Sequence, residues 1–336
     1  MDVLSVEDLA DGAGRLTGAP EQAALVIVDL ATATPRSAAR AAATLTDRCV
    51  AIVGIADRPL PASLTPLLDK LTCTLAPGGP GRSWVAADDA AIDRIAATAS
   101  QAPGATLVLT QLLPLAARAT VYDGLQAESL AYSMLLAGPE FAAWRAGTPA
   151  GPPPEDDDPV LIDRTGDVLT LTLNRPERHN AFGRGVRDAL IDALEIARLD
   201  DSVHEVVLRG AGRSFCSGGD LDEFGTAADP VAAHAVRLGR SAGWAVHRIR
   251  ERVRARLHGA CIGAGIEVPA FAARVDAADG TWFRLPELSM GLVPGAGGTV
   301  SMTHRIGPHR TAFMALTGDR IDLETALEWG LVDGRA

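Results

Sequence analysis

The first half of the chain alternates short apolar runs with alanine-rich stretches of helical character. The runs at 25–30 (LVIVDL) and 50–55 (VAIVGI) predict buried strands, since a strand covered on both faces needs no polar side. Residues 35–47, which lie between them, predict a helix with proline in its first turn. Strands that recur after helices indicate a partly parallel sheet. The further elements predicted here are strands at 71–76 and 106–110 and helices at 88–100, 112–120 and 124–145.

The second half repeats this alternation and places glycine-rich loops after its strands. The strand predicted at 203–209 runs into GAGRSFCSGGDLDEF, and the strand at 254–257 runs into HGACIGAGIE. A third strand, at 281–284, precedes LPELSMGLVPGAGGT. We therefore predict the α/β class for both halves. The remaining elements are a strand at 168–173 and helices at 185–199, 233–252, 299–306, 311–317 and 322–329.

A proline-rich acidic segment separates the halves. Residues 148–159 (TPAGPPPEDDDP) contain five prolines and a run of carboxylates, which sustain neither a helix nor a central strand. A chain of 336 residues is long enough for two domains of ordinary size. We expect one domain at 1–147 and another at 160–336, joined by a linker over 148–159.

Composition and charge narrow the class of protein. A chain that is 47% hydrophobic can bury a sizeable core, and a net charge of −11 argues against a nucleic-acid partner. Lys70 is the only lysine, so arginine also does the ordinary surface work and a lone arginine is weak evidence for a binding site. The cysteines show no paired spacing, the N-terminus is acidic, and no apolar run reaches the roughly 18 residues of a membrane span. We expect a cytoplasmic protein with no membrane association.

Two glycine-rich turns, 217–220 (SGGD) and 263–265 (GAG), each lie between a predicted strand and a predicted helix. Neither matches the dinucleotide or the Walker phosphate-binding pattern. Small residues allow backbone N–H groups to approach a ligand, and two converging N–H groups suit an oxyanion. Taken singly, each is more simply explained as a tight turn.

Two glutamates follow strands in comparable places. Glu267 lies two residues past the second turn, in the first turn of a predicted helix, and Glu287 lies in a Pro–Glu pair directly after a strand. The simpler alternatives are a solvated residue that favours the helix dipole and a cap for the next turn. No HExxH motif or clustered Cys/His spacing indicates a metal site.

Together, five segments resemble the crotonase (enoyl-CoA hydratase/isomerase) superfamily in content and order. The resemblance extends over residues 171–333 and implies a crotonase-like ββα spiral core. The segments are LTLNRPERHNAF (171–182), RSFCSGGDL (213–221), HGACIGAGIE (258–267), LPELSMGLVPGAGGT (285–299) and ALEWGLVD (326–333).

The resemblance also implies roles for individual residues. It places the carbonyl of a CoA thioester between the backbone N–H groups of Gly219 and Ala264, which form an oxyanion hole. The hydratase branch carries two glutamates, which match Glu267 as the group that activates water and Glu287 as the group that protonates the α-carbon. No cofactor is expected beyond the CoA of the substrate. The residues matching the family's substrate and CoA contacts are Arg178, Ala181, Gly219, Asp220, Leu221 and Ala264.

We therefore predict a lyase that hydrates a 2-enoyl-CoA to a 3-hydroxyacyl-CoA. The addition of water builds negative charge on the thioester oxygen, which two preorganised N–H donors stabilise. Two carboxylates around one water repel each other, and this keeps one of them protonated as an acid. The alternatives are another acyl-CoA reaction of the same fold, such as isomerisation or a lyase step of secondary metabolism, and a non-catalytic acyl-CoA-binding subunit.

Some features depart from the family pattern. Asp222 is acidic where well-known hydratases often have lysine, and the family continues beyond ALEWGLVD into helices that close the acyl pocket and support trimers. Residues 124–147 look like those helices. We expect residues 1–147 to be a degenerate crotonase-like copy that supplies them, the alternative being an unrelated α/β domain. We expect a homo-oligomer, a trimer or a hexamer.

Overall fold

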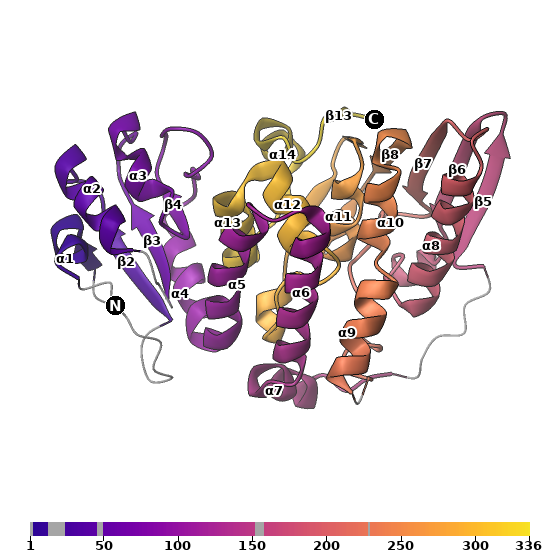
Figure 1. The fold of residues 1–336 in the computed structure, drawn as a ribbon, viewed down its shortest axis with the longest axis horizontal. Coiled ribbons are helices and arrows are strands. Elements are labelled where there is room, and N and C mark those ends of the chain that lie inside the picture. The colour runs from indigo at the N-terminus through magenta and orange to yellow at the C-terminus, as the bar shows by residue number, and fades with distance from the viewer. Residues whose placement is uncertain (1–2, 13–23, 46–49, 152–157, 228) are drawn as a thin grey trace.

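The computed structural model describes residues 3–12, 24–45, 50–151, 158–227 and 229–336. Helices and strands alternate along the chain, and the α/β class predicted from the sequence is confirmed. The first sheet lies at one end of the molecule and the strands within residues 160–210 at the other (Figure 1). Residues 152–157, which make up half of the predicted linker, lie outside the described residues. Within the described ranges, no helix combines the length and the apolar character that crossing a membrane requires.

A four-stranded parallel sheet forms the N-terminal end, in the order β1–β2–β3–β4. Val28 and Ile52 face one side and pack in one cluster with helices α1 to α3. Ile27 and Val53 face the other side and belong to the core that continues into the second half. Burial on both faces explains the uninterrupted apolar runs of these strands. The elements are β1 (Val3–Ser5), α1 (Val6–Ala10), β2 (Leu25–Asp29), α2 (Pro35–Thr44), β3 (Ala51–Ile55), α3 (Thr65–Leu68) and β4 (Cys73–Leu75).

The second half is built on two sheets. The larger has the order β13–β10–β8–β7–β6–β5, in which β5 and β6 pair antiparallel and the other neighbours pair parallel. The smaller has the order β12–β11–β9. The strands are β5 (Val160–Thr165), β6 (Val168–Leu173), β7 (Glu205–Gly210), β8 (Val253–Leu257), β9 (Ala260–Ile262), β10 (Arg274–Ala277), β11 (Trp282–Arg284), β12 (Ile321–Asp322) and β13 (Gly334–Arg335).

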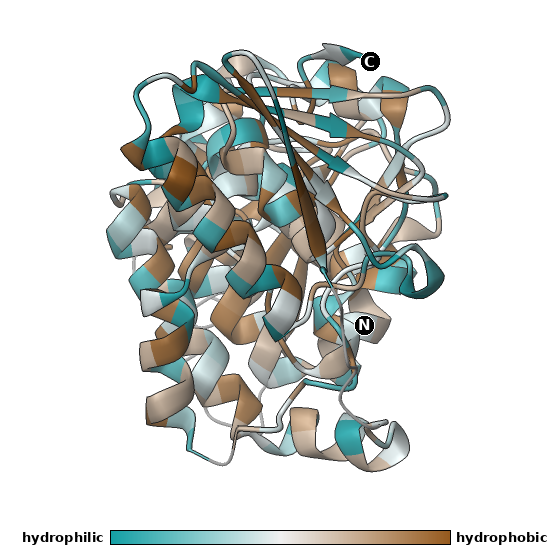
Figure 2. Cartoon of the chain, turned by 90° about the vertical axis from the view of Figure 1, so that its right-hand side faces the viewer, coloured by the Kyte–Doolittle hydropathy of each residue, from teal (hydrophilic) through white to brown (hydrophobic). Residues whose placement is uncertain are grey.

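The helix at Arg184–Leu199 buries one apolar stripe and leaves its polar side outward. Bands of hydrophobic and hydrophilic residues alternate along the helices in Figure 2. The single helix predicted at 233–252 is wrong: the chain forms two helices there. The Ser241 side chain accepts a hydrogen bond from the Trp244 N–H and so begins a new helix. The helices are α8 (Arg184–Leu199), α9 (Pro230–Gly239), α10 (Ala242–Arg248), α11 (Ala264–Glu267), α12 (Gly298–Ile306), α13 (Pro308–Thr317) and α14 (Leu323–Trp329).

Four further helices lie between the N-terminal sheet and the second half (Figure 1). Helices α4 and α5 pack against α13, and α6 packs against both α9 and α12. The strand predicted at 106–110 is wrong, because these residues lie inside α5, where a short apolar run fits either structure and Pro103 begins a helix. The four are α4 (Ala91–Gln101), α5 (Pro103–Ala116), α6 (Val121–Leu136) and α7 (Pro139–Gly147).

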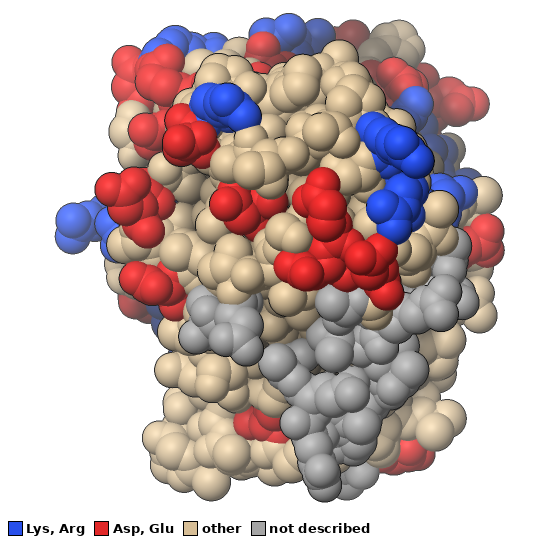
Figure 3. Space-filling model, turned by 90° about the vertical axis from the view of Figure 1, so that its left-hand side faces the viewer, with Lys and Arg blue, Asp and Glu red and all other residues tan. Residues whose placement is uncertain are grey.

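The surface of the N-terminal end is predominantly acidic. The chain carries 42 acidic residues against 31 basic ones. Figure 3 shows groups of acidic side chains across this face, with basic side chains scattered among them. An anionic ligand therefore needs a local cationic site to overcome the field of the whole molecule.

The turn that carries Gly219 is anchored by a buried ion pair. Arg175 and Asp220 are each 1% exposed, and the Arg175 Nη1 lies 3.1 Å from the Asp220 carboxylate. Arg175 also donates to the Ala181 carbonyl at 2.9 Å. The loss of one partner leaves a buried charge without compensation.

We predict that Arg175→Met lowers the free energy of unfolding by roughly 3–5 kcal/mol, because it leaves Asp220 with less compensation. Urea unfolding measures the effect. The control is Arg164→Met, which breaks the exposed Arg164–Asp200 pair and should cost at most about 1 kcal/mol. Equal losses in the two variants would contradict the prediction.

Candidate active site

The two glutamates singled out from the sequence lie at the same edge of one sheet. Strands β9 and β11 are parallel neighbours, with Ile262 opposite Arg284. Glu267 follows β9 at the end of the short helix α11, and Glu287 begins a 3₁₀ turn that follows β11. Because the carboxyl ends of parallel strands meet at one edge, the two side chains lie close together. The helix predicted after the second glycine turn is only four residues long and ends before Pro269.

Gly263 lies between the two carboxylates. A Cβ atom built there would be 2.5 Å from the Glu287 Oε1 and 3.5 Å from the Glu267 Oε1. The two oxygens therefore lie no farther apart than the sum of these distances. Gly263 also has a φ of 48°, which glycine adopts without strain. The position excludes any side chain and leaves a gap that both carboxylates face.

The two glycine-rich turns also lie next to each other. The backbones at Cys216 and Cys261 pair as an isolated parallel β-bridge, and the Ile262 N–H donates to the Cys216 carbonyl at 3.0 Å. These contacts bring the turn at 217–219 beside the turn at 263–265. In the described ranges, neither the Gly219 N–H nor the Ala264 N–H donates a hydrogen bond to the protein. Two unpaired backbone donors in neighbouring turns are the arrangement that an oxyanion requires.

A cavity of about 720 Å³ brings these groups together. Gly219, Asp220, Ala264, Glu267 and Glu287 all line it. The opposite wall comes from α6 of the first half and α9 of the second. Of the other residues predicted to contact CoA, Arg178, Ala181 and Leu221 are not part of the wall.

These other residues lie behind or beside the Gly219 turn. Arg178 donates to both Asp220 and Asp222, and the Asp222 carboxylate also accepts from the Gly151 N–H at 2.7 Å. The hydrogen bond from Arg178 lowers the pKa of Asp222. The acidic residue that departs from the family pattern is therefore paired within the protein, and Leu221 between the two aspartates is 46% exposed.

Burial dominates the electrostatics of the glutamate pair. Glu267 is 2% exposed and accepts hydrogen bonds from the Ala296 and Gly298 N–H groups, each at 2.8 Å. Burial raises its pKa to about 7 although these two bonds oppose the rise. Burial and then the charge of Glu267 raise the pKa of Glu287 well above the usual range, and its Oε2 has no partner among the described residues. Burial thus favours the neutral form of both carboxyl groups.

A third buried glutamate, which the sequence reasoning missed, enters the site from the first half of the chain. Glu128 of α6 is 2% exposed and lines the cavity. Its carboxylate accepts from the Gly297 N–H at 2.8 Å, the Thr299 N–H at 3.0 Å and the Thr299 hydroxyl at 2.6 Å. Burial and then the charge of Glu267 raise its pKa to about 8. The signal was available, since Glu128 occupies a core position in helical register with Leu125 and Tyr132.

Glu128 and Glu267 hold one loop between them. Four successive N–H groups, at residues 296–299, donate alternately to Glu267 and to Glu128. This loop forms the start of α12, where unpaired N–H groups and the helix dipole favour negative charge. The geometry of Glu267 therefore depends on a residue from the other half.

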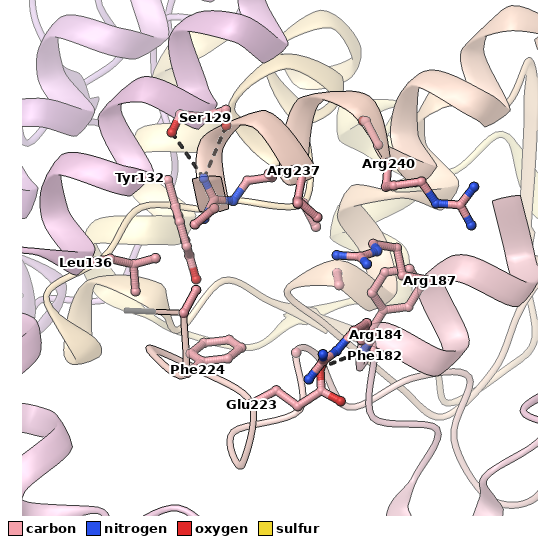
Figure 4. Close-up of a pocket in the computed structure, with 18 of the residues that line it drawn as sticks. Ser129, Tyr132, Leu136, Phe182, Arg184, Arg187, Glu223, Phe224, Arg237 and Arg240 are labelled. Carbon is pink, nitrogen blue, oxygen red and sulfur yellow. Dashed lines mark hydrogen bonds between the residues drawn. The ribbon is translucent and has the colours of Figure 1, made fainter. Parts of the chain in front are cut away.

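Figure 4 shows the other side of the cavity, where aromatic and arginine side chains gather. Phe182 and Phe224 lie near its lower part, and Glu223 accepts a hydrogen bond from the Arg184 N–H. Arg237 points toward Ser129 and the ring of Tyr132 on α6. Within the described ranges, no group of three or more His, Cys, Asp or Glu side chains is placed to hold a metal ion.

Comparison with known proteins identifies the second half of the chain. Residues 163–334 match the family model of enoyl-CoA hydratase/isomerase. The chain is 33% identical over 174 residues to 2,3-dehydroadipyl-CoA hydratase of Escherichia coli (strain K12), which covers 52% of this chain and 67% of that protein. It is 34% identical over 172 residues to 1,2-epoxyphenylacetyl-CoA isomerase of the same organism, over 49% of this chain and 64% of that protein.

A solved structure agrees with these matches. The enoyl-CoA hydratase of Thermoplasma volcanium GSS1 superposes with a TM-score of 0.50 at 29% identity, over 54% of this chain and 72% of that one. The predicted crotonase-like core is thereby confirmed. The chain spans about two thirds of the length of the relatives it matches, and these include both hydratases and isomerases.

We predict that Glu128→Gln flattens the pH dependence of stability. The folded protein keeps the Glu128 proton up to about pH 8, whereas the unfolded chain releases it near the ordinary pKa of 4.5. Unfolding between these values releases a proton, so stability falls as the pH rises through that window. The neutral amide removes a slope of up to about 1.4 kcal/mol per pH unit. Urea unfolding from about pH 5 to pH 8 measures it, and identical slopes for wild type and variant would refute the assignment.

Proposed function

Because the chain belongs to the enoyl-CoA hydratase/isomerase family, we propose that it hydrates a 2-enoyl-CoA to a 3-hydroxyacyl-CoA. One observation carries the choice of reaction: two buried glutamates, Glu267 and Glu287, flank Gly263 beside two unpaired backbone donors. Hydration needs a base for water and an acid for the α-carbon on the same side of the substrate. The pair supplies both.

The thioester oxygen is proposed to lie between the N–H groups of Gly219 and Ala264. Negative charge develops on this oxygen as water adds to the β-carbon, and the donors are already fixed by their turns. Removal of one such donor costs about 2.7–4 kcal/mol in comparable sites. Since the donors are backbone groups, the alanine at 264 serves as well as glycine. Gly219 and Ala264 both line the same cavity.

The two carboxyl groups differ in the direction that the reaction needs. Glu267 accepts two backbone hydrogen bonds, which favour its charged form, and is proposed to take the proton of the attacking water. Glu287 has one oxygen without a partner among the described residues and is proposed to deliver its proton to the α-carbon. The water oxygen bonds to the β-carbon, and the proton gained by Glu267 replaces the one lost by Glu287. Their proximity across Gly263 supports that return transfer.

Helices of the first half are proposed to close the acyl pocket. Helix α6 contributes Leu125, Glu128, Ser129 and Tyr132 to the cavity wall and packs on α9 and α12. We propose on this basis that residues 1–147 form the closing domain, as a degenerate copy of the catalytic fold, and 160–336 the catalytic one. The described cysteines are free thiols, which supports a cytoplasmic location. A homo-oligomer, trimeric or hexameric, is proposed from the family resemblance.

We predict that Glu267→Gln and Glu287→Gln each lower kcat for hydration of crotonyl-CoA by about 10²–10⁴-fold. The loss of ultraviolet absorbance of the conjugated thioester measures turnover, and calorimetry with butyryl-CoA measures binding, which should persist. The control is Glu195→Gln, a glutamate that pairs with Arg198 and does not line the cavity, which should leave kcat unchanged.

Two outcomes would contradict the proposal. Full activity in both glutamine variants would exclude the pair from the chemistry. Isomerisation of 3-hexenoyl-CoA that survives Glu267→Gln but not Glu287→Gln would instead assign a single-carboxylate proton shuttle. That second reaction is favoured by the lone unpartnered oxygen of Glu287 and by the isomerases among the relatives.

A further inference from the structure

One cationic side chain of the cavity has no role in the hydration chemistry. Arg237 of α9 lines the wall that α9 shares with α6 and is half-buried (Figure 4). Its guanidinium lies over the ring of Tyr132, 4.6 Å from the ring centroid. Arginine is the ordinary surface cation of this chain, so its presence alone says little. Its placement in the cavity wall distinguishes it from the exposed arginines.

The neighbours of Arg237 are neutral acceptors, all reached through one nitrogen. Its Nη1 donates to the Ser129 carbonyl and hydroxyl, each at 3.2 Å, and to the Ser133 hydroxyl at 2.9 Å. In the part of the chain that the structure describes, no carboxylate forms an ion pair with it, and Nε and Nη2 donate no hydrogen bond. Serines and the ring therefore fix its orientation and leave half of the guanidinium available.

The other half-buried arginines of the same wall differ in this respect. Arg187 pairs with Asp188 at 2.9 Å, and Arg240 pairs with both Asp188 and Asp192 at 3.0 Å. The charge of Glu128 acts on Arg237 from a distance, but that carboxylate is bound to the loop at 297–299. A partly desolvated guanidinium without a counter-ion is unfavourable unless an anion binds there.

The ring of Tyr132 lies between Arg237 and the loop that holds Glu267. Tyr132 contacts Arg237 with one face, and its ring is so close to Gly295 that a Cβ there would lie 2.2 Å from it. Gly295 directly precedes Ala296, whose N–H donates to Glu267. A group that reaches Arg237 past Tyr132 is therefore several bonds from the reacting carbons and belongs to the far end of an acyl chain.

We propose that the substrate is the CoA ester of a dicarboxylic 2-enoic acid and that Arg237 binds its terminal carboxylate. The proposal rests on the proposed function. The free Nε and Nη2 edge forms the planar two-donor fork that matches a carboxylate. The carboxylate supplies the missing counter-ion. Near the two glycine-rich turns the cavity wall presents Glu267 and Glu287, which offer a carboxylate no positive charge.

The test compares matched substrates in wild type, Arg237→Met, Arg237→Lys and Arg240→Met. Chain lengths C6 to C10 are assayed as the 2-enoyl-CoA and as its ω-carboxylate. We expect wild type to prefer the ω-carboxylate at one chain length and Arg237→Met to lose about 10- to 100-fold in kcat/KM for it, through KM. The neutral partner should change less than about threefold, and Arg237→Lys should recover part of the loss. Arg240→Met, which removes an already paired arginine, should keep the wild-type ratio.

Binding of unreactive esters separates this proposal from the proposed function. Calorimetry with octanoyl-CoA, its ω-carboxylate and free CoA measures the same preference without turnover. If wild type binds the ω-carboxylate more tightly and Arg237→Met abolishes this preference, the proposal for Arg237 is supported even where no ester is hydrated. In that case only the proposed hydration fails. Equal affinity for the two esters in wild type, an equal loss for both in the variant, or a loss of free CoA binding would overturn it, the last by assigning Arg237 to the CoA phosphates.

Discussion

The alternate binding of four backbone N–H groups by two buried carboxylates is the interaction on which the rest of this site depends. Glu267 belongs to the second half of the chain and Glu128 to helix α6 of the first half. Both carboxylates accept hydrogen bonds from the loop at 296–299. Each carboxyl group is almost fully removed from water, so hydrogen bonds to the start of α12 are its principal compensation. Neither half can rearrange here without leaving a buried charge or unpaired donors.

This dependence makes the two halves one structural unit at the site. The parallel pairing of β9 with β11 brings Glu267 beside Glu287. The backbone β-bridge between Cys216 and Cys261 brings the two glycine-rich turns together. Those relations lie wholly within the second half. The position of the Glu267 carboxylate nevertheless depends on a loop that α6 also holds, and Tyr132 of α6 packs on the same loop at Gly295. The geometry of the Glu267 carboxylate and the packing of α6 over the cavity are therefore coupled.

Local sequence was sufficient to predict the elements in which the spacing of apolar residues distinguishes a helix from a strand. It was also sufficient to place the two glutamates directly after strands that are parallel. It failed at 106–110, where an apolar run of five residues fits both structures and the packing against α13 favours the helix. It failed at Ser241, which divides a helix by capping a new one. Glu128 and Arg237 were missed because their roles arise from residues far away in the chain. A glutamate in an apolar stripe was the signal that pointed to the first.

The charges of the cavity restrict what it can bind. Burial raises the pKa values of Glu128, Glu267 and Glu287, so the site is less anionic than its composition indicates. One guanidinium on the opposite wall, oriented by serines and a tyrosine ring, then provides positive charge without a carboxylate partner among the described residues. A neutral acyl chain would leave that charge uncompensated at the point where the chain ends. An acyl chain that ends in a carboxylate would compensate it there, whereas Glu267 and Glu287 offer such a carboxylate no positive charge. The position of this guanidinium thus favours both the end group and the orientation of the substrate.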